Sequence, residues 1–141
     1  MSERLDQLAH YFETMTEATL PRLREFYATD ACFKDPFNEV EGVAEIERIF
    51  RHMYVPLSHP RFVIHTLIEQ GEQAFLGWHF DFRIKRYRPD VTQTIRGGSH
   101  LRWDASGKVS FHRDYWDAAE ELYEKLPVVG AIMRFLKRRA S

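Results

Sequence analysis

The sequence contains almost no cysteine and no long apolar run. Its single cysteine, Cys32, excludes an intramolecular disulfide and a zinc site of the CxxC type. No stretch approaches the ~18 apolar residues of a membrane-spanning helix. The first residues, MSERLDQLAHYF, are charged and lack the apolar core of a signal peptide. We therefore expect a cytoplasmic protein.

An excess of charge of either sign is also missing. The sequence has 20 Lys and Arg against 21 Asp and Glu, a formal net charge of −1 at pH 7. No overall positive charge attracts the chain to nucleic acid, so we expect no nucleic-acid partner. No His, Asp or Glu set has metal-ligand spacing, and we expect no metal and no cofactor. A chain of 141 residues is long enough for one domain with one core.

The first half of the chain has helical periodicity. Apolar residues at helical spacing predict helices over residues 3–17, 20–27 and 43–54, with Ser2 as N-cap of the first. A short strand, DACFKDP, lies between the second and third helices and stops at Pro36.

After residue 60 the period changes from helical to two, which predicts an antiparallel meander over residues 61–70, 74–87, 92–103 and 108–116. Gly97-Gly98 suggests a bulge or bend in the third of these strands. This order indicates an α+β fold, in which a curved sheet wraps around the N-terminal helices and forms a cone with an internal cavity. We expect one domain over 1–141, with 118–141 as a C-terminal helical extension.

Several short motifs occur in order. The sequence has Tyr27-Ala28-Thr29-Asp30-Ala31, then Asp35-Pro36-Phe37, then Gly42 before the third helix. The hairpin LRWDASGKV follows, and an aromatic-rich strand ends in Trp116-Asp117. Over residues 5–117 this pattern resembles the NTF2-like superfamily, in its ketosteroid isomerase and SnoaL-like polyketide cyclase branch. The resemblance implies a cone-shaped α+β fold and a homodimer.

The resemblance also implies site residues. The isomerase's general base falls on Asp35, its phenolic oxyanion donor on Tyr11, and its protonated carboxylic acid on Ser99. SnoaL-like cyclases place an acid/base aspartate on the last strand, where Asp114 is nearest, with His112 beside it. The implied apolar lining of the pocket, taken together with the strand alternation, comprises Phe33, Phe37, Leu76, Trp78, Phe80, Phe82, Leu101, Trp103 and Trp116.

Each of these residues also has an ordinary structural interpretation. Asp35 can cap the turn before Pro36. His112, Asp114 and Trp116 share one face of a strand, and that face can point into the cavity or towards solvent or a partner. Tyr11 can be one more apolar contact of the first helix, and Cys32 is expected in the core.

The C-terminal segment LPVVGAIMRFLKRRAS combines an apolar stripe with basic residues. It can pack on the mouth of the cone or on a partner subunit, contact an anionic membrane surface weakly, or cover the cavity as a lid.

Three functions remain open from the sequence. The first is a cofactor-free isomerase or cyclase that transfers protons on a small hydrophobic molecule. The second is a non-catalytic binding protein for a lipid-like or polycyclic ligand. The third is a structural or interaction module, because fold alone does not fix function.

Overall fold

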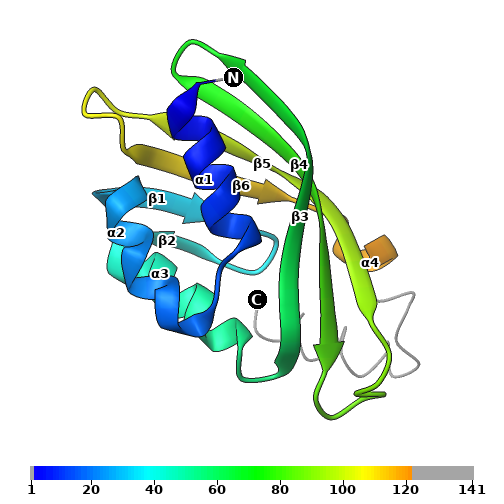
Figure 1. Cartoon of the computed structure of the whole chain (residues 1–141). Helices are drawn as coiled ribbons and strands as arrows, with labels where there is room; N and C mark the ends of the chain where they lie inside the picture. Colours follow the sequence, from blue (N-terminus) through cyan, green and yellow to red (C-terminus); the bar gives the residue numbers. More distant parts are fainter. Residues whose placement is uncertain (1, 122–141) are drawn as a thin grey trace.

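The computed structural model describes residues 2–121, and Figure 1 shows their arrangement. The helical segments are α1 (Glu3–Glu13), the 3-10 helix η1 (Glu17–Arg22), α2 (Leu23–Phe26), α3 (Val43–Met53) and α4 (Ala118–Glu121). The strands are β1 (Tyr27–Lys34), β2 (Glu39–Glu41), β3 (Leu57–Gln70), β4 (Gln73–Ile84), β5 (Gln93–Trp103) and β6 (Val109–Tyr115). The predicted α+β fold is confirmed.

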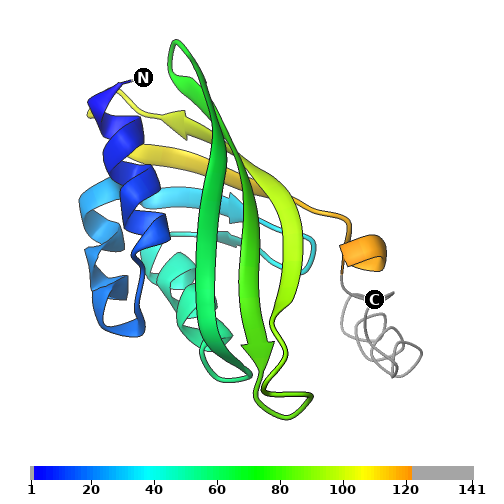
Figure 2. The same ribbon diagram turned by 45° about the vertical axis from the view of Figure 1, so that its right-hand side comes forward.

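All six strands join in one sheet, in the order β2-β1-β6-β5-β4-β3. The predicted antiparallel meander is present from β3 to β6. The prediction missed two features. β1 pairs parallel to β6, so the sheet is mixed, and the short edge strand β2 pairs with β1. Figure 2 shows the sheet curving around α1, α2 and α3, which lie on one side of it.

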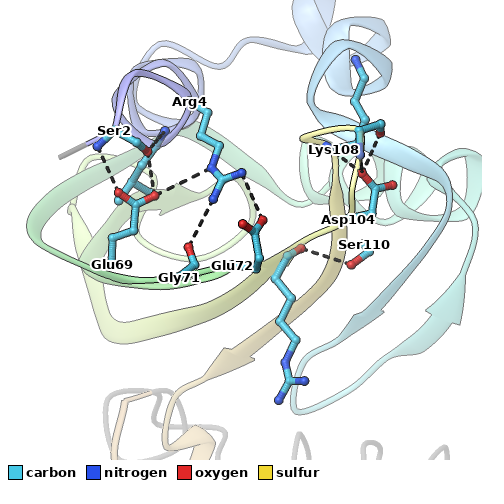
Figure 3. A network of polar contacts seen from close by, with 11 residues as sticks. Ser2, Arg4, Glu69, Gly71, Glu72, Asp104, Lys108 and Ser110 are labelled. Carbon is cyan, nitrogen blue, oxygen red and sulfur yellow. Dashed lines mark hydrogen bonds and ion pairs between the residues drawn. The ribbon is translucent and has the colours of Figure 1, made fainter.

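The helix α1 begins where the sequence predicts. The Ser2 hydroxyl accepts a hydrogen bond from the backbone N–H of Leu5, as an N-cap does. Figure 3 shows that Ser2 also donates to Glu69 at the end of β3, from its backbone nitrogen at 3.0 Å and from its hydroxyl at 2.6 Å. Arg4 reaches Glu72 and the Gly71 carbonyl in the same turn. These contacts attach the start of the chain to the β3–β4 hairpin.

The helices end differently from the prediction. α1 stops at Glu13 rather than at residue 17, because Thr14 caps it and its hydroxyl donates to the His10 carbonyl. Thr16 and Thr19 then form a capping box that starts η1. The predicted helix over 20–27 is therefore divided between η1 and α2, and Tyr27 already belongs to β1.

The core lies between the helices and the concave face of the sheet. Leu76, Trp78, Phe80 and Phe82 of β4 are buried on this face, as their alternation predicts. Leu5 and Leu8 of α1 and Ile46 and Phe50 of α3 pack in the same cluster. The outward neighbours in β1 include Cys32, which is exposed, so its predicted core position is wrong.

Gly97 and Gly98 do not form the predicted bulge, since β4 and β5 pair without a register shift through both residues. Neighbouring side chains and backbone pack so closely against these two positions that a side chain would not fit. A Cβ on Gly97 would lie 2.7 Å from Cη2 of Trp78 and 2.8 Å from the Tyr115 carbonyl oxygen.

Among the described residues, no helix is long and apolar enough to cross a membrane. The predicted C-terminal helical extension over 118–141 lies outside the described residues except for its first part, which contains α4, and the basic amphipathic segment also lies outside them.

Candidate functional site

A cavity of about 450 Å³ opens between α3, the β1–β2 loop and the concave face of the sheet. Most of its lining is aromatic or aliphatic, with Phe62 from β3 and Ile95 from β5 completing the wall. Two carboxylates, Asp35 and Asp114, face this apolar space. The predicted lining residues that contribute to it are Phe33, Phe37, Trp78, Phe80, Phe82 and Trp116.

Asp35 follows β1 and has both properties that the sequence left as alternatives. Its Oδ1 accepts hydrogen bonds from the backbone N–H groups of Phe37, at 2.8 Å, and Asn38, at 2.6 Å. The amide nitrogen of Asn38 donates to both of its oxygens. Burial nevertheless raises the pKa of Asp35, against the effect of these hydrogen bonds, and the nearby Asp114 raises it further. The residue is therefore a turn cap and a desolvated group of the cavity at once.

Asp114 is held by one side chain of its own strand β6 and one of the neighbouring strand β5. Its Oδ1 accepts a hydrogen bond from the Ser99 hydroxyl at 2.5 Å and lies 2.6 Å from Nε2 of His112. The indole nitrogen of Trp78 donates to the Ser99 oxygen at 2.9 Å. Within residues 2–121, no hydrogen bond reaches Oδ2 of Asp114. That oxygen remains available to a ligand.

The network continues from His112 to Tyr27 at the start of β1. The Tyr27 hydroxyl lies 2.6 Å from Nδ1 of His112. Full burial raises the pKa of Tyr27 well above its ordinary value, so the phenol keeps its proton and can donate a hydrogen bond. We assign the hydrogen of the His112 ring to Nε2, which then donates to the Asp114 carboxylate while Nδ1 accepts from the Tyr27 hydroxyl. A chain of donors therefore runs from the core towards the Asp114 carboxylate.

A bulge in β6 sets which side chains face inward. Trp103 pairs with Val109 and Arg102 pairs with Phe111, so Ser110 is an extra residue on β6. Val109 and His112 are consequently both buried, although they are three residues apart. His112 is buried, Asp114 lines the cavity and Tyr115 is 46% exposed, so the alternative in which the face of His112 and Asp114 points towards solvent is wrong.

The remaining predicted residues lie elsewhere. Leu76 and Ser99 line a much smaller void of about 20 Å³, beside the network, together with His112 and Asp114. Leu101 is fully buried in the core. Trp103 packs under the Arg4 guanidinium, 4.2 Å from its ring centroid, and borders an open groove beside α1.

Tyr11 is not placed at the cavity. Its hydroxyl donates to the Thr19 carbonyl at 2.9 Å, and its ring borders the same groove as Trp103. Burial raises the pKa of Tyr11 to about 12. The structure thus separates Tyr11 from Asp35 and Asp114, whereas the sequence grouped the three.

Tyr27 is the residue of the network that sequence reasoning missed. It opens the Tyr-Ala-x-Asp-Ala motif, so its position was noted without a role. A tyrosine directly after a helix and within a strand is an ordinary core residue by periodicity. Only the parallel pairing of β1 with β6 brings it to a residue 85 positions later. Among the described residues, no group of three or more His, Cys, Asp or Glu side chains could hold a metal ion.

The fold occurs in solved structures of several kinds of protein. A protein with a ketosteroid isomerase-like fold from Catenulispora acidiphila, solved in complex with trimethylamine, is 14% identical, with a TM-score of 0.71 over 86% of this chain and 91% of that one. A candidate SnoaL-like polyketide cyclase from Shewanella putrefaciens is 18% identical, with a TM-score of 0.70 over 89% and 99%. An epoxide hydrolase of the LEH-like type from M. tuberculosis is 13% identical, with a TM-score of 0.68 over 94% and 90%.

These identities establish the fold alone. No curated protein matches the chain. The sequence model of the SnoaL-like domain, however, matches residues 8–112, which contain most of α1, the Asp35 turn, the sheet up to His112 and most of the cavity wall. The chain belongs to the SnoaL-like domain family.

Proposed function

We propose that this protein is a cofactor-independent enzyme that removes a proton from a carbon of a small hydrophobic molecule and returns it, as in an isomerisation or an aldol-type cyclisation. The observation that carries the proposal is Asp114. One of its oxygens is held by Ser99 and His112, and the other accepts no hydrogen bond from residues 2–121 at the wall of an apolar cavity.

Asp114 is assigned as the general base. A positioned carboxylate surrounded by apolar side chains meets a C–H bond without competing water, which strengthens its interaction with the proton. The Ser99 hydroxyl and Nε2–H of His112 fix the orientation of the carboxylate through hydrogen bonds to Oδ1. Trp78 and Tyr27 in turn fix Ser99 and His112. After proton transfer, the same oxygen can return the proton to another carbon of the bound substrate.

Asp35 is assigned as the second group that touches the substrate. Its Oδ1 is occupied by the turn, which makes it a poorer base than Asp114 in spite of its raised pKa. Its place at the cavity makes it a polar anchor for the substrate.

The proposal is tested with a neutral probe of proton abstraction, 5-nitrobenzisoxazole. Removal of its ring C–H proton by a base breaks the N–O bond and gives a coloured cyanonitrophenolate. We expect turnover by the wild type and a loss of about a hundredfold or more in Asp114→Asn, the range in which a general base contributes. The exposed Asp90, which is not part of the cavity lining, provides the control: Asp90→Asn should turn over the probe as the wild type does.

Asp114→Asn keeps an oxygen that can accept from Ser99 and His112, so its fold should persist, and circular dichroism checks this. Equal turnover by wild type and Asp114→Asn would contradict the assignment of the base. Absence of turnover in both, with binding of the probe retained, would favour the second candidate, a binding protein for a hydrophobic ligand. The largely apolar lining of the cavity is the observation that supports that candidate.

A further inference from the structure

The charges around the cavity are one-sided. Asp35 and Asp114 both line it, and within residues 2–121 neither Lys nor Arg does. The basic side chain at its wall is His52, which is exposed on α3. Among the described residues, the His112 ring forms a hydrogen bond with Asp114, and neither Lys nor Arg forms an ion pair with either carboxylate. Asp35 has no cation of its own in this part of the chain.

Burial of a carboxylate without a cation is unfavourable, and the raised pKa of Asp35 reports that cost. An anionic ligand would add a like charge to the same low-dielectric space. A cationic ligand would supply the missing partner. The electrostatics of the cavity therefore favour a positive charge.

Three side-chain donors in or beside the cavity wall are already engaged within the described residues. The Trp78 indole donates to Ser99, and the Ser99 hydroxyl donates to Asp114. The Asn38 amide donates to Asp35. Oδ2 of Asp114 accepts no hydrogen bond in the described part of the chain. A ligand that brings an N–H or O–H donor of its own would satisfy this oxygen.

Aromatic rings provide the remaining surface. Phe62 stacks on Phe80 at 4.5 Å between centroids, and Phe80 on Phe82 at 5.2 Å. Phe37 and Trp116 meet edge to face at 5.4 Å beside the Asp35 turn. Ring faces attract organic cations, most strongly when the cation is desolvated, and they bind an apolar body equally well.

We propose that the ligand of this cavity is a hydrophobic amine, bound as its ammonium ion with the charged nitrogen at Asp35 and the apolar body against the aromatic rings of β3 and β4. The identification of this ligand as the substrate rests on the proposed function. It leaves Asp114 free to act on a carbon of the bound molecule.

The experiment uses three naphthalenes that differ in the charge of one substituent: 1-naphthylmethylamine, 1-naphthylmethanol and 1-naphthoate. Their dissociation constants are measured by isothermal titration calorimetry at neutral pH with the full chain. We expect the amine to bind about tenfold or more tightly than the alcohol, and the carboxylate to bind most weakly. In Asp35→Asn the preference for the amine should fall to within about threefold, whereas Asp90→Asn should keep it.

Binding of the uncharged alcohol by Asp35→Asn serves as the check that the cavity of this variant is intact. The proposal is overturned if the wild type binds the amine no more tightly than the alcohol, or if Asp35→Asn keeps the full preference. The benzisoxazole probe is neutral, so its turnover tests proton abstraction separately. Preference for the amine without turnover of the benzisoxazole would refute the proposed enzymatic function and support the proposed ligand class. Turnover without preference for the amine would support the enzymatic function and refute the ligand class.

Discussion

Replacement of Asp35 by leucine should lower the stability of the protein. In the structure Oδ1 of Asp35 accepts from two backbone N–H groups and from the Asn38 amide. Leucine removes these three contacts and the fourth, from the Asn38 amide to Oδ2. Loss of a capping acceptor typically costs about 0.5–2 kcal/mol, and the relief of carboxylate desolvation offsets part of the loss. We expect a net loss of about 0.5–1.5 kcal/mol, and each kcal/mol lowers Tm by about 2–5 °C at this chain length.

Replacement of Asp35 by asparagine should have a much smaller effect, because the amide oxygen still accepts from the turn. The pH dependence of the stability difference between the wild type and Asp35→Asn isolates the effect of the buried charge. The folded pKa of Asp35 is raised from 3.8, so the folded state binds the proton more tightly than the unfolded chain. Relative to Asp35→Asn, the wild type should therefore gain stability as the pH falls through the folded pKa. That gain should be complete below 3.8 and lost as the pH rises.

Thermal melts monitored by circular dichroism between acid and neutral pH measure both effects. Asp90→Leu and Asp90→Asn, at an exposed position, are the matched controls and should change Tm little. A Tm of Asp35→Leu equal to or above that of the wild type would refute the stabilising role of the hydrogen bonds to Asp35. A fall in Tm leaves the cavity role open, because Asp35 both caps the turn and lines the cavity.

Three further outcomes are expected. Gly97→Ala should destabilise the protein by about 1–3 kcal/mol in chemical unfolding, because the new Cβ meets Trp78 and a backbone carbonyl. Gly98→Ala should destabilise it less, because its Cβ mainly meets the end of the half-exposed Phe75 ring. Equal losses of stability in the two variants would contradict the packing argument. Tyr27→Phe leaves Nδ1 of His112 without its donor and should lower the free energy of unfolding by about 1–3 kcal/mol. Nitrogen NMR of the wild type should show the Nε2–H tautomer of His112, and an Nδ1–H tautomer would reverse the direction of the network. Glu69→Gln should lower stability by less than about 1 kcal/mol. The Ser2 hydrogen bond lowers the folded pKa of Glu69 from 4.5, so the difference in stability from wild type should vanish as the pH falls through that pKa. A difference that persists in acid would show that the charge of Glu69 is not involved.

Local signals in the sequence were sufficient for the elements and for the inner face of the sheet. The period of two in β4 predicted which residues are buried, and the Ser2 cap predicted where α1 begins. Both depend on residues a few positions apart, and burial on one side of the sheet imposes the pattern directly. Thr14 and Thr16 ended α1 early through side-chain contacts to the backbone that apolar periodicity does not register.

The candidate site depended on contacts between distant strands. The sequence put His112, Asp114 and Trp116 on one face of a strand but left open which way that face points. Pairing and the extra residue at Ser110 decided it, because a single inserted residue reverses the inward and outward positions beyond it. The tertiary structure also separated Tyr11 from the cavity and brought Tyr27 to His112.

The sequence by itself determined the α+β class, the helices and strands in their order, the family resemblance and the presence of Asp35 and Asp114 as candidate ionisable groups. Only the tertiary structure decided that Asp35 is both a cap and a cavity residue, and that one oxygen of Asp114 is held while the other has no hydrogen bond from the part of the chain that the structure describes. The physical reason is that propensity and periodicity act within a few residues. The proton affinity and free lone pairs of a carboxylate depend instead on which side chains from the other strands surround it.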